Sequence, residues 1–546
     1  MNGRNALLAL LQDEGVTHLF GNPGTTELAL MEALPAAPGL QYVLGLQESV
    51  VVAMADGFAR ASGRLAACNL HCMPGLGHAM GALYNARFAG SPLIVTAGQY
   101  EIGHGLQEPM LYESLVPIAQ PLVKWAVEPQ RVDDLPRIVR RAAKIATTPP
   151  CGPVFVSLPA SILDADAQLD CGRPTRVEAH GLPAPRVQEA LLRLLLAATA
   201  PVIIAGRELA EQDGMAAAGE LAQLLGAPVW QEPIAYNTRF PVRHPCAMGE
   251  LSRNQRKVRE RLAGHDLLVV LGADLLRMSV YSPVDPLPPG LRVVHISERD
   301  AELGKNYATE LALRAGVAET LAALLPLVRA QQDEAMRAAA RERLARIVAG
   351  NWSSRREALR AASAPADPAA AMQPLTLVRR LVDALPAGAL CVEEAPTTAP
   401  LLASLLPTEG GRDFLGLASG GLGFGMGGAV GAALARPGTP VVALVGDGSA
   451  MYAIQALWTA AHHRLPLTYV IANNRSYRIL EERMVSARRS ESFIGMQFGD
   501  PPLDFVALAR GMGVPGRRVT QADALERALH EAFAGDGPFL IDAAIT

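Results

Sequence analysis

Short runs of apolar residues alternate with helical stretches through most of the chain. The first block contains "THLFG", "LQYVLGL", "LAACNLH" and "SPLIVTAG". The same alternation recurs in a second block, with "PVIIAG", "LLVVLGADL" and "LRVVHIS". It recurs again in a third block, with "ALCVEE", "PVVALVGDG", "LTYVIANN" and "PFLIDAAI". Apolar strands separated by helices are typical of βαβ units, in which a parallel sheet is covered on both faces. The pattern predicts an α/β protein built from doubly wound parallel sheets.

Two polar stretches divide these blocks. Residues 164–186 are rich in Pro and Gly, and residues 340–370 read as a charged helix that ends in an Ala/Pro linker. Glu342 and Glu357 interleave with the arginines of this helix, which favours a solvated connection over a basic patch. We therefore predict three α/β domains, at residues 1–165, 186–335 and 371–546.

Composition excludes several classes of function. A net charge of −4 without blocks of one sign gives no electrostatic reason to bind nucleic acid. Six scattered cysteines without a CxxC pair fit a reducing compartment better than a disulfide framework. The start of the chain lacks a signal-peptide pattern, and the longest apolar run is too short to cross a bilayer. We expect a soluble, cytoplasmic protein with no membrane partner.

Polar residues follow two neighbouring strands of the third block. "TPVVALVGDGSA" places Asp447 just past a strand, where open α/β sheets bind ligands, and the flanking Gly446 and Gly448 let the backbone approach a phosphate. "LTYVIANN" brings Asn473 and Asn474 to the end of the next strand. Alone, each of these residues would be an N-cap or a turn residue. Together they supply the hard oxygen ligands of a Mg²⁺–diphosphate site.

The glycine-rich stretch at residues 419–434 resembles a dinucleotide fingerprint. That fingerprint requires a good strand before it and a ribose-binding acid about 20 residues later. "DFLGLAS" is a poor strand, and the acid that follows lies within the GDG turn. A nicotinamide-dependent dehydrogenase is therefore a minor alternative, and the glycines are better explained by close packing of a helix on its sheet.

GDG followed, after a gap of 24 residues, by NN resembles the signature of thiamin diphosphate (ThDP) enzymes. The resemblance implies that Asp447, Asn474 and the main-chain carbonyl of Ser476 hold Mg²⁺. It implies cofactor contacts from Leu422, Gly446, Gly448, Ser449 and Tyr452. Leu422 would be the bulky residue that bends the cofactor, although ordinary core packing explains it equally well.

In ThDP enzymes a glutamate hydrogen-bonded to the aminopyrimidine ring activates the cofactor. Glu48, in "LQYVLGLQESVV", follows a predicted buried strand and opens a helix, so it matches this residue. By itself it would be read as a first-turn acid favoured by the helix dipole. The resemblance now extends over the whole chain, as a pyrimidine-binding domain, a Rossmann-like central domain and a diphosphate-binding domain.

Within this superfamily the chain is most similar to the benzoylformate decarboxylases. The likeness rests on long stretches: "GNPGTTEL", "ALYNARFAGSPLIVTAGQ", "PLVKWAVEP", "SGGLGFGMGGAVG" and "GDGSAMYAIQALWTAA". It implies that the hydroxyl group of Thr25 contacts the substrate carboxylate, where the alternative role is to stabilise a turn. It also implies a catalytic His71, a residue type that acetolactate synthases generally lack there and that suits proton transfer near neutral pH. His78 is expected to be a surface or packing residue.

The chain departs from the decarboxylase pattern near the expected substrate pocket. The second catalytic histidine is replaced by Ser279, which makes His104 a candidate for its role. Gly416 stands where a phenylalanine is expected, and the cluster Glu481, Glu482 and Arg483 interrupts an apolar segment, after Ile479 and Leu480. These changes put a phenyl pocket in doubt.

The sequence thus predicts a ThDP- and Mg²⁺-dependent decarboxylase that converts a 2-oxo acid to an aldehyde and CO₂, with possible acyloin carboligation. The alternative within the superfamily is a carboligase resembling acetolactate synthase, although FAD has no clear footprint in the central domain. The resemblance also implies a homodimer or homotetramer whose active sites lie between subunits.

Overall fold

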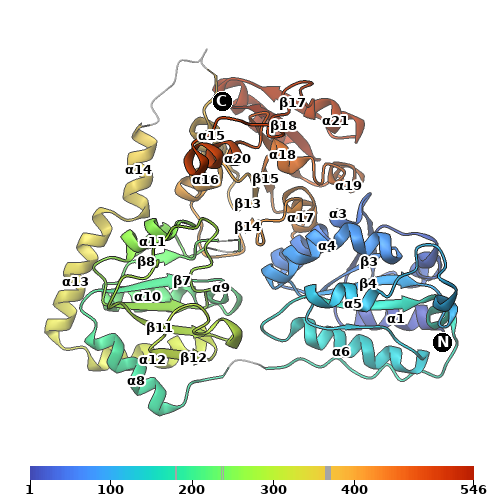
Figure 1. Ribbon diagram of the computed structural model, residues 1–546, viewed down its shortest axis with the longest axis horizontal. Helices are drawn as coiled ribbons and strands as arrows, with labels where there is room; N and C mark the ends of the chain where they lie inside the picture. The colour runs from blue at the N-terminus through green and yellow to red at the C-terminus, as the bar shows by residue number, and fades with distance from the viewer. Residues whose placement is uncertain (179–180, 235, 238, 363–370) are drawn as a thin grey trace. The chain divides into compact units, whose positions relative to one another are not determined.

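The computed structural model describes residues 1–178, 181–234, 236–237, 239–362 and 371–546 (Figure 1). It contains three parallel six-stranded sheets, which confirms the predicted fold class. Contacts group the chain into two compact units. Unit 1 comprises Met1–Val177, Asp367–Ala399 and Leu415–Thr546, and unit 2 comprises Glu178–Ala366 and Pro400–Phe414. The first and third sheets thus belong mainly to unit 1, and the second sheet to unit 2.

The first sheet has the strand order β2-β1-β3-β4-β6-β5. Its strands are β1 (His18–Gly21), β2 (Gln41–Leu44), β3 (Ala66–Leu70), β4 (Leu93–Gln99), β5 (Ala126–Val127) and β6 (Val154–Pro159). The helices around it are α1 (Gly3–Asp13), α2 (Leu28–Ala33), α3 (Glu48–Ser62), α4 (Cys72–Ala89), α5 (Leu115–Ala119), α6 (Leu135–Thr147) and α7 (Ala160–Asp164). The strand before Glu48 was expected to be buried, but β2 is an edge strand in which only Val43 is buried.

The second sheet has the order β12-β11-β10-β7-β8-β9. Its strands are β7 (Pro201–Ala205), β8 (Val229–Gln231), β9 (Ala247–Glu250), β10 (Leu267–Leu271), β11 (Arg292–Ser297) and β12 (Leu311–Arg314). Its helices are α8 (Pro185–Ala197), α9 (Glu208–Glu211), α10 (Met215–Leu225), α11 (Gln255–Leu262), α12 (Val317–Gln331), α13 (Glu334–Ala349) and α14 (Trp352–Ala362). The predicted connecting helix is therefore two helices, and the Ala/Pro part of the linker, at 363–370, lies outside the described residues.

The third sheet has the order β14-β13-β15-β16-β18-β17. Its strands are β13 (Leu390–Glu394), β14 (Phe414–Gly416), β15 (Val441–Gly446), β16 (Leu467–Asn473), β17 (Gly516–Val519) and β18 (Phe539–Ala544). Its helices are α15 (Pro374–Ala384), α16 (Ala399–Leu405), α17 (Phe424–Ala435), α18 (Asp447–Ala450), α19 (Ala456–His462), α20 (Arg478–Arg483), α21 (Phe505–Gly511) and α22 (Ala522–Ala534). The weak strand "DFLGLAS" forms only the short edge strand β14.

Within unit 1, helix α17 packs closely against α3 (Figure 1). A Cβ atom added to Gly431 would lie 1.9 Å from the Met54 carbonyl oxygen, and one added to Gly57 would lie 2.1 Å from that of Gly428. Only glycine permits backbones to approach this closely. The glycine-rich stretch therefore packs α17 on a second helix as well as on its own sheet, where Gly425 contacts Glu394 and Val445.

The apolar core of unit 1 is continuous across this helix pair. Phe58 and Val51 of α3 belong to the same buried cluster as Met426 and Val430 of α17. In the described part of the chain, no helix combines the length and the hydropathy that a bilayer crossing requires.

Candidate active site

The residues predicted to be catalytic lie at one edge of the first sheet. Strand β1 pairs in parallel with both β2 and β3, so the carboxyl ends of the three strands are neighbours. The loop after β1 carries Thr25, β2 leads into Glu48 at the start of α3, and β3 leads into His71 at the N-cap of α4. This edge is where open α/β sheets bind ligands.

The buried side chain of Glu48 has a polar partner on each carboxylate oxygen. Asn22, in the loop after β1, donates from Nδ2 to Oε1 at 3.4 Å, which is a long hydrogen bond. His78 approaches Oε2 with its Nδ1 at 3.0 Å. His78 is exposed, as the sequence predicted, but its contact with Glu48 was not predicted.

His71 is held by a carboxylate that the sequence analysis missed. Its Nδ1 lies 2.8 Å from Glu27 Oε2 and 3.2 Å from the Thr26 hydroxyl group. Glu27 is fully buried and also accepts hydrogen bonds from the Gly24 and Gly98 N–H groups. A carboxylate on Nδ1 favours the tautomer with its proton there and leaves Nε2 for other chemistry.

Thr25 and His104 are the other two predicted catalytic residues, and the described part of the chain shows no comparable contacts for them. Thr25 is exposed, and the neighbouring Thr26, not Thr25, contacts His71. His104 lies in the segment after β4, where its ring is 5.8 Å from that of Tyr100. Neither contacts Glu48 or His71 in the described part of the chain, so their catalytic roles stay predictions.

The predicted metal and diphosphate ligands line a pocket at the carboxyl edge of the third sheet. The walls of this pocket include Leu422, Gly446, Asp447, Gly448, Ser449, Asn474 and Ser476. Tyr452, another predicted cofactor contact, is exposed and is not among the residues that line it. Glu48 and His71 do not line it either. The structure therefore has two groups of candidate site residues, one on each sheet of unit 1.

Asp447 and Asn474 present oxygens that backbone groups already orient. Asp447 accepts hydrogen bonds from the N–H groups of Gly448 at 2.8 Å and Arg475 at 2.6 Å. Asn474 Oδ1 accepts from the Ser476 N–H group at 3.0 Å. Asn473, in contrast, donates to Asp542 at 2.8 Å, so Asn474 is the asparagine of this pair at the pocket. Burial raises the pKa of Asp447 to about 6, a penalty on the carboxylate that a bound cation would offset.

A buried carboxylate fixes the turn beside Leu422. Glu394, at the end of β13, accepts hydrogen bonds from the Gly423 N–H group at 2.7 Å and from that of Gly425. Burial raises the pKa of Glu394 to about 8, and the neighbouring Glu393 adds to the effect. This contact attaches the start of α17 to the strand end and so sets the position of Leu422.

The segment after Asn474 lines the pocket differently from the prediction. Arg478 and Ile479 line it, whereas Glu482 and Arg483 are exposed and lie outside it. Glu481 is buried and accepts a hydrogen bond from Gln497 at 3.0 Å. Thr397 and Thr398, just past β13, also line the pocket. Their place after a strand end was the signal that could have identified them.

Gly416 does not line the pocket either. It is buried at the end of β14, and its carbonyl oxygen accepts a hydrogen bond from Arg60 of α3 at 2.8 Å. Gly416 therefore contacts α3 and does not shape the pocket, whose lining includes the charged Arg478.

The strand ends of the second sheet, in unit 2, carry a buried ionic cluster. Arg299 contacts Glu208 at 2.8 Å and also Asp274, while Glu208 accepts from the Ser297 hydroxyl group at 2.7 Å. Burial and the neighbouring Asp274 raise the pKa of Glu232 in the same cluster. Mutually paired charges thus occupy the edge at which such sheets bind ligands.

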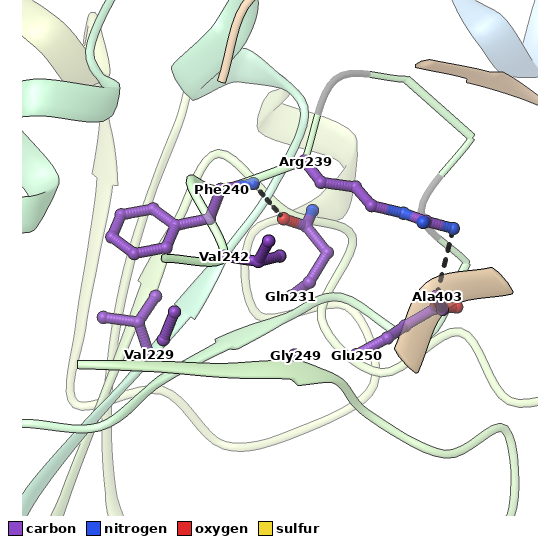
Figure 2. A pocket seen from close by; sticks show the side chains of 9 residues that line it. Val229, Gln231, Arg239, Phe240, Val242, Gly249, Glu250 and Ala403 are labelled. Atoms are coloured by element: carbon purple, nitrogen blue, oxygen red, sulfur yellow. Dashed lines mark hydrogen bonds and ion pairs between the residues drawn. The ribbon is translucent and has the colours of Figure 1, made fainter. Parts of the chain in front are cut away.

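Unit 2 also has a small cavity between β8, β9 and the loop that follows β8 (Figure 2). Gln231 and Arg239 supply polar groups to it, and Gln231 Oε1 accepts a hydrogen bond from the Phe240 N–H group at 2.8 Å. None of the predicted site residues lines it. Ser279, at the position where the sequence analysis expected the second histidine, lies exposed elsewhere in this unit.

Family models of thiamine pyrophosphate enzymes match three segments of the chain. The N-terminal TPP binding domain of thiamine pyrophosphate enzymes matches residues 1–112, the central domain of these enzymes matches residues 188–324, and their C-terminal TPP binding domain matches residues 398–543. The C-terminal match includes the glycine-rich stretch, so the nicotinamide-dependent alternative is wrong.

Curated relatives match over the full length. A benzoylformate decarboxylase of Pseudomonas aeruginosa is 36% identical, over 98% of each chain. A putative acetolactate synthase large subunit of Mycobacterium tuberculosis is 32% identical, over 100% of this chain and 99% of the relative. A probable 2-ketoarginine decarboxylase of P. aeruginosa is 29% identical, over 98% of this chain and 93% of the relative.

Solved structures of decarboxylases are also similar to the chain over its full length. The ThDP-dependent 4-hydroxybenzoylformate decarboxylase of Rhodococcus jostii superposes with a TM-score of 0.88 at 32% identity, over 100% of this chain and 99% of that one. The benzoylformate decarboxylase of Polynucleobacter necessarius gives 0.89 at 30% identity, with the same coverage. The chain is an enzyme of the thiamine pyrophosphate family, similar over its whole length to 2-oxo acid decarboxylases.

Proposed function

We propose that the protein catalyses the ThDP- and Mg²⁺-dependent decarboxylation of a 2-oxo acid to an aldehyde and CO₂. The observation that carries this proposal is His71, whose ring the buried Glu27 holds at the end of β3. The decarboxylase pattern places a histidine at this position, and acetolactate synthases generally lack one. The names of several relatives favour the same reaction class.

The residues of the third-sheet pocket fit a Mg²⁺–diphosphate group. Asp447 and Asn474 supply a carboxylate and an amide oxygen, and Ser476 adds a backbone carbonyl, which are the hard donors that Mg²⁺ prefers. Among the described residues no group of three or more His, Cys, Asp or Glu side chains is placed so that it could hold a metal ion. Since the site then has a single carboxylate, we infer that the diphosphate completes the coordination of the metal.

Each catalytic residue has a separate task in this proposal. When bound, ThDP supplies the nucleophilic carbon that adds to the keto group and takes up the electrons released with CO₂. Glu48 favours the active tautomer of the pyrimidine ring through one hydrogen bond. His71 donates a proton from Nε2 during aldehyde formation, while Glu27 keeps Nδ1 protonated. The hydroxyl group of Thr25 contacts the substrate carboxylate.

Carboligation is the second candidate activity. Ser279 stands where decarboxylases carry a second histidine, and one absent general acid is worth about 10² to 10⁴ in rate. Slower protonation gives a second carbonyl compound time to react, so acyloin should form alongside the aldehyde. His104 is the candidate for a compensating acid, and its replacement by alanine should shift the products further towards acyloin.

The decisive experiment is an assay with ThDP, Mg²⁺ and a panel of 2-oxo acids that includes benzoylformate and pyruvate. We expect CO₂ and aldehyde from at least one acid, weak turnover of benzoylformate and measurable acyloin. If acetolactate from pyruvate were the main product, the carboligase alternative would replace the proposal.

Two variants test the residue assignments within the same assay. Glu48→Gln should abolish turnover and leave ThDP bound, because only the activating acid is lost. Asp447→Ala should weaken the binding of both ThDP and Mg²⁺ in calorimetry. Near-normal turnover of the first variant, or unchanged binding by the second, would move the site elsewhere.

The same proposal includes a cytoplasmic location and a homodimeric or homotetrameric assembly. The location is supported by the six cysteines, none of which forms a disulfide in the described part of the chain.

A further inference from the structure

Helix α4 approaches Glu48 with two residues on the same face. A Cβ atom added to Gly75 would lie 3.5 Å from Glu48 Cγ, and His78, three residues later, reaches Glu48 Oε2 with its Nδ1 at 3.0 Å. Glu48 is buried, whereas the His78 side chain is 60% exposed. The pair therefore joins the buried carboxylate to a ring at the surface of the chain.

The two oxygens of Glu48 are held unequally. Oε2 has the shorter contact, with His78, and Oε1 has only the long contact with the Asn22 amide at 3.4 Å among the described residues. Neutral and charged hydrogen bonds weaken beyond about 3.2 Å. Oε2 is thus fixed by the protein, and Oε1 is the oxygen with capacity for a further strong bond.

We propose that His78 is a positioning residue for Glu48, which fixes Oε2 so that Oε1 serves the pyrimidine ring of ThDP. This inference rests on the proposed role of Glu48 in activating the cofactor. His78 touches neither the substrate nor the reacting carbon in this role. It removes the rotational freedom of the carboxylate, and misplacing a catalytic group by about 1 Å can cost about 100-fold in rate.

Two substitutions of His78 distinguish the effect of its hydrogen bond from the effect of its imidazole ring. His78→Asn keeps a polar donor near the place of Nδ1, and His78→Ala removes it. His530→Ala, an exposed histidine on α22, is the matched control. For each variant three quantities are measured: the near-ultraviolet circular dichroism signal of the imino tautomer of bound ThDP, kcat, and the calorimetric affinity for ThDP with Mg²⁺.

We expect His78→Ala to lower the imino signal, and to lower kcat by about 10- to 100-fold, with ThDP affinity changed less than about threefold. His78→Asn should restore most of the signal, and His530→Ala should match the wild type. The proposal is overturned if His78→Ala keeps the full imino signal, or if His78→Asn fails as completely as His78→Ala. Failure of the proposed decarboxylation would appear separately, as an absence of CO₂ release from every 2-oxo acid in a wild-type protein that still shows the signal.

Discussion

Arg478 brings a positive charge to the wall of the pocket that contains Asp447. It is the first residue of α20, and its Nε lies 3.7 Å from Glu481 Oε2. The Glu481 carboxylate is also shared with Ser476 and Gln497. At 3.7 Å the two charges attract without a hydrogen bond, so the guanidinium group keeps donors for a ligand.

The charge at Arg478 should influence which 2-oxo acids bind. We expect Arg478→Gln to lower kcat/KM for a 2-oxo dicarboxylate, relative to a neutral 2-oxo acid of equal length, by about tenfold, because a charge-assisted hydrogen bond is lost. Kinetics with the two substrates measure this ratio. Arg483→Gln, outside the pocket and exposed, is the control. An unchanged ratio, or a loss of ThDP affinity in place of selectivity, would assign Arg478 to another role.

The sequence could predict the catalytic residues that follow a strand directly. Glu48 and His71 come straight after apolar runs, and the rule that ligands bind at strand ends finds such residues. Their partners are not visible in the same way, because Glu27 is 44 positions away from His71 and His78 is 30 away from Glu48. Glu27 in particular reads as an ordinary acid in the first turn of a helix. Glu27 and His78 meet their partners only in the folded chain, so their spacing in the sequence does not identify them.

At the scale of elements, the contact between α3 and α17 links the two sheets of unit 1. Gly431 is the tightest point, since a Cβ atom there would meet the Met54 carbonyl oxygen at 1.9 Å. This oxygen belongs to the backbone of α3, so it cannot move aside as the end of a flexible side chain could. We expect Gly431→Ala to lower the free energy of unfolding by about 1 to 3 kcal/mol, as overpacking does, and to be detected by urea denaturation.

A glycine of the same chain with open space around it provides the control. A Cβ atom on Gly81, on α4, would have no neighbour within 4 Å. Gly81→Ala should leave the free energy of unfolding unchanged or raise it by up to about 1 kcal/mol, as a helical Gly→Ala change does. Equal effects of the two substitutions would contradict the close packing of α3 on α17.

The contact of Glu394 with the start of α17 should make stability depend on pH. Its folded-state pKa of about 8 lies above the ordinary value of 4.5, mainly because of burial. The stabilisation is therefore fully present below pH 4.5 and is lost as the pH rises through 8. We expect the Tm of the apoprotein to fall between about pH 4.5 and about pH 8, where the unfolded chain binds fewer protons than the folded one, and to fall less in Glu394→Gln, which does not ionise. Parallel Tm curves for both proteins would refute this role of Glu394.

The elements themselves could largely be predicted from the sequence. Central strands such as β7, β10 and β16 are uniformly buried, so their continuous apolar runs predicted them clearly. Edge strands were harder to predict, because only one residue of β2 is buried and β14 contains three residues in all. The role of the glycines in α17 could not be predicted, since their partner helix lies more than 350 positions earlier in the chain.

At the scale of the whole molecule, several large apolar side chains are exposed in loops of unit 1. Leu106 and Met110, in the segment that follows β4, are 93% and 81% exposed. Ile494, which follows α20, is 90% exposed. Glu48 and Asp447 do not share a pocket within the described chain, and we predict that a second copy of the chain completes the site.

Mixing two inactive variants tests this arrangement. Glu48→Gln lacks the activating acid and Asp447→Ala lacks the metal ligand, so each homo-oligomer should be inactive. If each site takes Glu48 from one subunit and Asp447 from the other, a mixed dimer has one intact site and one doubly defective site. After unfolding and joint refolding at equal amounts, random pairing should restore about a quarter of the wild-type activity, and light scattering should give the mass of a dimer or tetramer. No recovery in a mixture whose subunits demonstrably exchange would mean that each chain builds its sites alone, and an active monomer would refute the shared site directly.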